Sequence, residues 1–271
     1  MVSSYTTVLD IPNRNQRGYK DFMVVAIASQ KGGTGKTTTS IQLAAGLARR
    51  GERVLLVDID SQANASKVLI GHYQDLTKDE TIYATIIDRK PLPIHKSSVE
   101  NLDVVPSHIL LSNTDVVLTT AMDHREARLK AHLDMLKDDY DYIFIDCPPA
   151  LSWLTLNAFT AADRVLMVVS PGYFELDSIN QLSKTVKEVH DLFNPSLKFI
   201  GILFTMSAGT INSRTSLQVL RQGYADTVLN TVIPRNTDIS DALYNKQDIF
   251  TYSPRSYSAD AYRKLIEELF P

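Results

Sequence analysis

The sequence of 271 residues predicts one α/β domain, in which a mostly parallel, twisted sheet carries helices on both faces. Short apolar runs rich in β-branched residues alternate with stretches of helical character along most of the chain. Runs of that kind are typical of strands buried on both faces of a parallel sheet. Right-handed crossovers through the helices would gather the carboxyl ends of the strands at one edge. We therefore expect a ligand site at that edge.

Six apolar runs are predicted strands, and four longer stretches are predicted helices. The strands span residues 23–29, 54–57, 102–105, 142–145, 165–169 and 199–204. The helices span residues 38–50, 128–137, 179–193 and 259–270, and Gly51 is expected to end the first of them. No internal repeat or linker interrupts this order. We therefore predict a single domain over residues 22–271, preceded by an irregular arm of residues 1–21.

Composition excludes several classes of protein. Cys147 is the only cysteine, so the chain cannot form an internal disulfide, which suits a reducing cytoplasm. The first residues are polar, unlike a signal peptide, and no run of about 18 apolar residues predicts a membrane span. The formal net charge is −3, so any contact with DNA must come from a local basic patch. We expect a cytoplasmic protein.

A glycine-rich segment between the first strand and the first helix predicts a phosphate-binding loop. It reads Gln30-Lys-Gly-Gly-Thr-Gly-Lys-Thr-Thr38. Glycine amides can turn inward around a phosphate, and the N-terminus of the helix adds partial positive charge. Lys36 is expected to reach the β- and γ-phosphates of a nucleotide, Thr37 to ligate Mg²⁺ and Thr38 to bond the α-phosphate. The predicted nucleotide contacts of the loop are Lys31, Gly32, Gly33, Thr34, Gly35, Lys36, Thr37 and Thr38.

The loop departs from the pattern G-x-x-x-x-G-K-[ST], because Gln30 stands at the first glycine position. Lys31 adds a second cation at the start of the loop. Its side chain need not face the nucleotide of its own chain. Lys31 therefore either reaches the nucleotide of a neighbouring subunit or lies solvated at the surface.

Acidic residues end two of the predicted strands. Asp146 follows the run 142–145, and an aspartate in that position beside a phosphate loop is the usual partner of Mg²⁺. Asp58 and Asp60 follow the run 54–57, where one acid could bear on the magnesium shell and the other orient the attacking water. No nucleophilic triad is required, because phosphoryl transfer relies on positioning and on stabilisation of charge. Cys147 is expected to be a small buried residue.

Four segments together resemble the ParA/MinD family of deviant Walker A ATPases, and they are most similar to its ParA (Soj-like) partition branch. The segments are Gln30–Thr38, Val57-Asp-Ile-Asp-Ser-Gln-Ala-Asn64, Ile145-Asp-Cys-Pro-Pro149 and Val232-Ile-Pro-Arg-Asn236. The resemblance implies a P-loop NTPase fold that binds ATP with Mg²⁺. It also implies an ATP-sandwich homodimer and weak intrinsic hydrolysis that DNA and a partner protein stimulate.

The same resemblance implies roles for individual residues. Lys31 occupies the position of the signature lysine that contacts the nucleotide of the other subunit, and Asp60 matches the aspartate required for hydrolysis. Residues 233–236 match the segment that helps to hold the adenine. The expected catalytic residues are Lys31, Lys36 and Asp60; the expected metal ligands are Thr37, Asp60 and Asp146; and the nucleotide contacts outside the loop are Met206, Pro234 and Asn236.

Members of this branch bind double-stranded DNA non-specifically as ATP-bound dimers, and a cargo-bound, ParB-like activator releases them. The resemblance thus implies association with the nucleoid and positioning of a plasmid, a chromosome or a protein organelle such as a carboxysome. The candidate DNA contacts are Arg214, Arg221, Arg235, Arg255, Arg263 and Lys264. Residues 205–212 depart from the Thr-Met-Tyr-Asp-like turn of ParA proteins, which leaves the local partner and DNA contacts open.

Three other classes of protein are alternatives to this interpretation. A MinD-like ATPase that associates with membranes needs a basic amphipathic C-terminal helix, but residues 262–271 carry two bases and two acids. We expect that helix to pack on the sheet, with no membrane partner. A metallocluster-assembly ATPase on the same fold would be expected to carry paired cysteines, and a kinase-like transferase an insert for its acceptor. Neither feature is found in this sequence.

Overall fold

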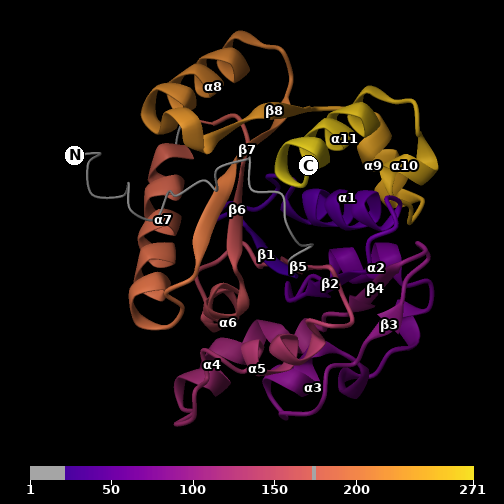
Figure 1. Cartoon of the computed structure of the whole chain (residues 1–271), viewed down its shortest axis with the longest axis vertical. Coiled ribbons are helices and arrows are strands. Elements are labelled where there is room, and N and C mark those ends of the chain that lie inside the picture. Colours follow the sequence, from indigo (N-terminus) through magenta and orange to yellow (C-terminus); the bar gives the residue numbers. More distant parts are fainter. Residues whose placement is uncertain (1–21, 173–174) are drawn as a thin grey trace.

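The computed structural model describes residues 22–172 and 175–271, so the arm predicted for residues 1–21 lies outside the described residues. One eight-stranded sheet runs through the described part, in the order β3-β4-β2-β5-β1-β6-β7-β8 (Figure 1). Every neighbouring pair is parallel except β3 and β4, which are antiparallel. The predicted α/β fold with a mostly parallel sheet is confirmed.

The strands agree with the sequence in the centre of the sheet and differ at its edges. They are β1 (Met23–Ala28), β2 (Val54–Asp58), β3 (His95–Lys96), β4 (Leu102–Val105), β5 (Tyr142–Asp146), β6 (Arg164–Val169), β7 (Lys198–Ser207) and β8 (Val228–Pro234). The two edge strands, β3 and β8, were not predicted. β3 has only two residues, and β8 mixes buried with exposed positions and so lacks a continuous apolar run.

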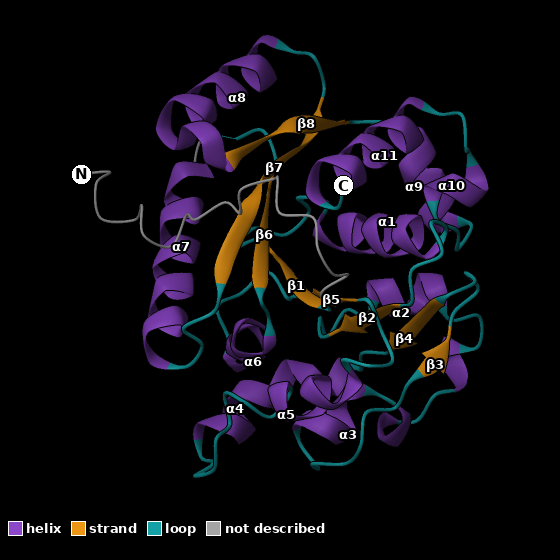
Figure 2. Ribbon diagram, viewed as in Figure 1, coloured by secondary structure: helices purple, strands orange, loops and turns teal. Residues whose placement is uncertain are grey.

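Helices cover both faces of the sheet (Figure 2). They are α1 (Lys36–Ala48), α2 (Asn64–Leu69), α3 (Ile82–Ile86), α4 (Thr114–Thr119), α5 (Lys130–Leu133), α6 (Trp153–Ala161), α7 (Glu175–Leu192), α8 (Ile211–Tyr224), α9 (Thr237–Tyr244), α10 (Ile249–Tyr252) and α11 (Tyr257–Leu269). Short 3₁₀ turns are η1 (Tyr73–Asp75), η2 (Lys78–Glu80), η3 (Ile109–Asn113), η4 (Asp134–Leu136) and η5 (Ala225–Thr227). The helix expected over residues 128–137 is shorter than predicted, because α5 tightens into η4 at Asp134.

The central strand β1 divides the core into two layers. Val24 and Ala26 face a cluster that includes residues of α6 and α7, whereas Val25 and Ile27 face a cluster that includes residues of α1 and α11. Alternate side chains of a strand point to opposite faces, so a strand that is apolar throughout is buried on both. Helices α1 and α11 lie together on one side in Figure 2, and α6 and α7 lie on the other.

The carboxyl ends of the three central strands meet at the edge where the glycine-rich loop begins. β1 ends at Ala28, next to β5, whose last residue Asp146 pairs with Ile27. On the other side of β5, Asp146 also pairs with Asp58 at the end of β2. Residues separated by more than a hundred positions are therefore brought to one edge, as the parallel topology predicted.

Candidate active site

The loop between β1 and α1 has the backbone geometry that its glycines allow. Gly33 and Gly35 adopt φ angles of 76° and 83°, in the left-handed region that other residues rarely occupy. Gly35 immediately precedes α1 and provides no side chain to cap it. The first-turn amides of α1 thus lack the usual side-chain acceptor, which leaves them to bind an anion.

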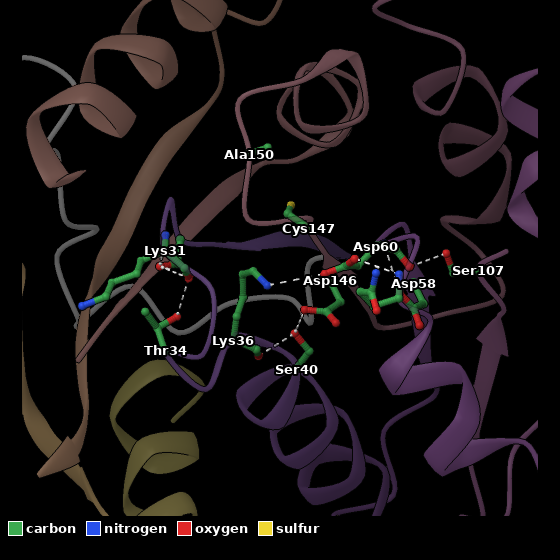
Figure 3. Close-up of polar contacts among 12 residues, drawn as sticks. Lys31, Thr34, Lys36, Ser40, Asp58, Asp60, Ser107, Asp146, Cys147 and Ala150 are labelled. Carbon is green, nitrogen blue, oxygen red and sulfur yellow. Dashed lines mark hydrogen bonds and ion pairs between the residues drawn. The ribbon is translucent and has the colours of Figure 1, made fainter. Parts of the chain in front are cut away.

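The two lysines of the loop lie in different environments. The Lys36 side chain is buried, and its Nζ is 3.9 Å from Oδ2 of Asp60, which is buried as well. Lys31 is exposed, and Figure 3 shows its side chain pointing away from Lys36. The backbone amide of Lys31 donates a hydrogen bond to Oγ of Ser29 (3.3 Å), which fixes the start of the loop.

Asp146 is fully buried opposite the start of α1. Its Oδ1 accepts a hydrogen bond from Oγ of Ser40 (3.0 Å), while Oδ2 has no hydrogen-bond partner among the described residues (Figure 3). Burial raises the pKa of Asp146, whereas the positive charge of Lys36 and a hydrogen bond from Thr37 oppose that rise. A buried carboxylate oxygen without a partner is costly, so this atom is suited to a cation.

The residues around Asp146 suit Mg²⁺, which needs few protein ligands, better than a metal that is coordinated by protein side chains alone. Mg²⁺ takes oxygen ligands and keeps several waters or phosphates, needing only one or two carboxylates. Thr37 and Asp146 supply a hydroxyl and a carboxylate oxygen at the start of α1. In the part of the chain that the structure describes, no group of three or more His, Cys, Asp or Glu residues could hold a metal. A metal bound here would therefore need phosphate or water oxygens to complete its coordination.

The two acids at the carboxyl end of β2, Asp58 and Asp60, contact different partners. Both Ser66 groups, the backbone N and Oγ, donate to Oδ2 of Asp58 (2.9 and 2.7 Å). Burial raises the pKa of Asp58 to about 7, the charge of Asp146 adds to the rise, and the Ser66 hydrogen bonds oppose it. Asp60 instead accepts from the backbone N of Gln62 (3.0 Å) and approaches Lys36 with its other oxygen. Of the two, Asp60 is the acid beside the loop lysine.

The end of β7 contacts the glycine-rich loop directly. Oγ1 of Thr205 donates to the carbonyl of Thr34 (2.6 Å) and also lies 3.0 Å from the carbonyl of Val169. Cε of Met206 lies 3.7 Å from the position a Cβ would take on Gly35, and Met206 itself has a φ of 52°. Met206 is therefore placed against the loop by the strand that carries Thr205.

Pro234 is the last residue of the neighbouring strand β8, and Asn236 follows it. Pro234 pairs with Ser207 at the end of β7, while Oδ1 of Asn236 accepts from the backbone N of Asp238 (3.0 Å) and caps α9. The Asn236 amide also donates to Oδ2 of Asp238 (3.2 Å). The structure thus gives Asn236 a local capping role beside its expected contact with nucleotide.

Sequence reasoning missed two polar residues of this site. Ser40 lies four positions after Lys36, hence on the same face of α1, and this spacing was a usable signal. Thr205 lies in β7, two residues before its end, and only the folded sheet brings it to the loop. Cys147 is buried, as predicted, and burial raises the pKa of its thiol, so it is unreactive.

The candidate DNA contacts fall into two groups at the β8 side of the molecule (Figure 1). One group comprises Arg214 and Arg221 on α8 and Arg235 just after β8, all of them exposed. The other comprises Arg255, Arg263 and Lys264 at and within α11. Arg263 is engaged locally, because it pairs with Asp260 (2.6 Å) and donates to the carbonyl of Pro254.

Comparison with known proteins agrees with this geometry. A family model described as an AAA domain matches residues 22–199. The Soj sporulation initiation inhibitor of Bacillus subtilis is 41% identical over 253 residues, which cover 91% of this chain and 97% of Soj. The chain belongs to the ParA family of partition ATPases. The chromosome partitioning protein ParA of Myxococcus xanthus is 38% identical to this ParA-family chain over 260 residues, which cover 94% of it and 91% of that ParA.

The fold of this ParA-family chain also occurs in proteins other than partition ATPases. The crystal structure of cobyrinic acid a,c-diamide synthase from Mycobacterium smegmatis, with a bound ATP analogue and magnesium, superimposes with a TM-score of 0.78. It is 30% identical and covers 91% of this chain and 93% of the synthase chain. Because one fold supports several activities, the site residues have to decide between them.

Proposed function

We propose that this chain is a ParA-type switch that binds Mg²⁺-ATP in the loop of residues 31–38 and hydrolyses it slowly. One observation carries the proposal: Oδ2 of Asp146 is buried without a partner beside an uncapped helix N-terminus. The amides of that N-terminus would donate to a bound triphosphate, and Thr37 and Asp146 would hold the Mg²⁺ that accompanies it. No other site in the described residues combines these features.

Each polar residue then has a defined task in hydrolysis. Lys36 neutralises charge on the β- and γ-phosphates, and Asp60, 3.9 Å from its ammonium group, orients the attacking water. Bound Mg²⁺ would stabilise the charge that develops on the phosphate oxygens. Because Ser40 donates to Oδ1 of Asp146, the carboxylate is held in place and its Oδ2 is left available to a metal.

ATP would also join two copies of the chain. The Lys31 side chain is exposed and points away from Lys36, which supports its reaching the nucleotide of a second subunit (Figure 3). Closure by both Lys31 side chains and opening on hydrolysis would make the dimer a nucleotide-dependent switch. Loss of the γ-phosphate removes the group that Lys31 is proposed to bind.

The ATP dimer would bind DNA through a basic patch made of Arg214, Arg221 and Arg235. Arg214 and Arg221 are seven positions apart and share one face of α8. Arg235 lies beside the start of α8, because its backbone N donates to the carbonyl of Ser207 and Oγ of Ser207 contacts Oγ of Ser213. Two copies of the patch would contact phosphates without reading the base sequence.

The proposed biological role is to position or segregate a cargo on the nucleoid, with a ParB-like activator that stimulates hydrolysis. The relatives Soj and ParA support this role over membrane association. The apolar face of α11, including Tyr262, Leu265 and Ile266, is buried against the core and is not offered to lipid. Within the described ranges, no helix is both long enough and apolar enough to cross a membrane.

The decisive experiment measures nucleotide binding after removal of the buried lysine. Lys36→Ala is expected to abolish Mg²⁺-ATP binding, because the triphosphate loses its closest cation. Lys184→Ala, which removes an exposed lysine from α7, is the matched control and should bind ATP like the parent protein. Fluorescent ATP analogue titration gives the result, and unchanged affinity in Lys36→Ala would refute the loop assignment.

A further inference from the structure

Four buried residues beside the loop form a closed ring of hydrogen bonds: Asp58, Asp60, Ser66 and Ser107. Figure 3 labels three of them, Asp58, Asp60 and Ser107. The Asp60 backbone N donates to Oδ1 of Asp58 (3.1 Å), and Oγ of Ser66 donates to Oδ2 of Asp58 (2.7 Å). The Ser107 backbone N donates to Oγ of Ser66 (2.9 Å), and Oγ of Ser107 donates to the carbonyl of Asp60 (2.6 Å). Each member therefore touches the next.

The ring holds the main chain of Asp60 from both sides. Its N–H is bonded by Asp58 and its carbonyl by Ser107, while the Asp60 carboxylate remains directed to Lys36. Ser66 and Ser107 are fully buried. In a low-dielectric interior, a fully satisfied polar network is rigid, so the position of Asp60 depends on every member.

Ser107 reaches this ring from a distant part of the chain. It follows strand β4, which pairs with β2, and its own carbonyl accepts from the hydroxyl of Tyr73 (3.2 Å). The hydrogen bonds of Ser107 described here join it to Tyr73, Ser66 and Asp60, and not to the glycine-rich loop. Its hydroxyl instead donates to the backbone carbonyl of Asp60, whose Oδ2 lies 3.9 Å from Nζ of Lys36.

We propose that Ser107 and Ser66 are positioning residues for ATP hydrolysis, acting through Asp60. They would fix the Asp60 backbone so that its carboxylate stands where the attacking water must be oriented. This inference rests on the proposed role of Asp60 in hydrolysis. If the ring served stability alone, breaking it would lower the melting temperature and leave the turnover of the folded protein unchanged.

The test compares Ser107→Ala with Ser258→Ala in the full chain. Both serines are fully buried, but Oγ of Ser258 has no hydrogen-bond partner in the described part of the chain and lies on α11. Ser107→Ala is expected to lower kcat for Mg²⁺-ATP hydrolysis by about tenfold, because Asp60 loses its fixed position. The dissociation constant for ATP should stay within about twofold, because no group that touches the nucleotide is removed. Ser258→Ala should match the parent in both quantities.

A second variant separates positioning from a general loss of structure. Ser66→Ala breaks the ring at another bond while it leaves Oγ of Ser107 in place. If the ring acts as one unit, Ser66→Ala also lowers kcat, and the double variant is no slower than the worse single variant. If Ser107→Ala does not fold, the same comparison made on Ser66→Ala decides the question.

Asp60→Ala distinguishes failure of this inference from failure of the proposed function. Parent-like turnover in Asp60→Ala would overturn the role of Asp60 and the ring proposal with it. Loss of turnover in Asp60→Ala, together with parent-like kcat in Ser107→Ala and Ser66→Ala, would overturn the ring proposal alone. A kcat reduced in both serine variants at unchanged ATP affinity supports it.

Discussion

Asp58 and Asp146 occupy matching positions, but their carboxylates differ in how fully they are hydrogen-bonded. They end neighbouring parallel strands, pair with each other in register and are both fully buried. The Asp58 carboxylate accepts three hydrogen bonds, two from Ser66 and one from the backbone N of Asp60. Asp146 accepts from Ser40 on Oδ1, whereas its Oδ2 has no hydrogen-bond partner among the described residues.

This difference shows that position at a strand end does not by itself define a metal ligand. A carboxylate that is saturated by donors holds the backbone around it, whereas one with an unused oxygen is available to a cation. The local chain decides between the two states. Ser66 follows β2 closely in sequence, and both its N–H and its hydroxyl donate to Asp58. In the hydrogen bonds described for Asp146, no residue that follows β5 plays this part.

The largest expected effect comes from Asp146→Asn. Replacing the open carboxylate with an amide removes the negative charge that would hold Mg²⁺, so hydrolysis should fall by about 100-fold or more. The free energy of unfolding without nucleotide should stay the same or increase, because a buried charge is lost. Phosphate-release kinetics and urea unfolding measure the two quantities.

The next effect comes from the matched variant Asp58→Asn. An amide nitrogen cannot accept from Ser66 or Asp60, so at least one buried donor loses its partner. The protein should therefore be destabilised by about 1–3 kcal/mol in the absence of nucleotide and magnesium. Urea unfolding of both Asn variants under identical conditions gives the comparison. Equal destabilisation of the two would contradict the assignment of one saturated and one open carboxylate.

The sequence was sufficient for the parts of this contrast that depend on local pattern. The apolar runs ending at Val57 and Ile145 predicted both strands, and the glycines before Lys36 predicted the loop. The ring around Asp60 could not be predicted, because Ser107 meets it through a tertiary contact between segments 47 positions apart. Periodicity records which face of an element is buried, and it does not record which serine a carboxylate will bond.

The same reason explains the elements that sequence reasoning missed. Helix α8 carries many Ser, Thr, Asn and Gln side chains, which weaken its helical signal, yet Thr210 caps it through a bond from the backbone N of Ser213 (3.3 Å). Edge strand β8 is set by pairing with β7 and by Glu268, whose carboxylate accepts from the backbone N of Asn230 and Thr231. Neither partner is near in sequence to the strand it supports.

The smallest expected effect concerns the basic residues, where an arginine held by local partners can be compared with one that forms no ion pair among the described residues. Arg263 is engaged locally by Asp260 and by the carbonyl of Pro254, and its guanidinium lies 5.5 Å from the ring centre of Phe250. Arg214 is exposed and takes part in none of the ion pairs formed within residues 22–172 and 175–271. Arg214 is thus the better candidate to contact a DNA phosphate.

Arg214→Ala should therefore weaken ATP-dependent binding to unrelated DNA duplexes by roughly three- to tenfold and lower the salt dependence by about one ion. Arg263→Ala is the matched control and should change DNA affinity by less than about twofold, since its charge is already neutralised by Asp260. Fluorescence anisotropy at several salt concentrations measures both. If the two variants lost equal affinity for DNA, local ion pairing would not decide which arginines contact DNA. The proposed basic patch would then have to include residues of α11.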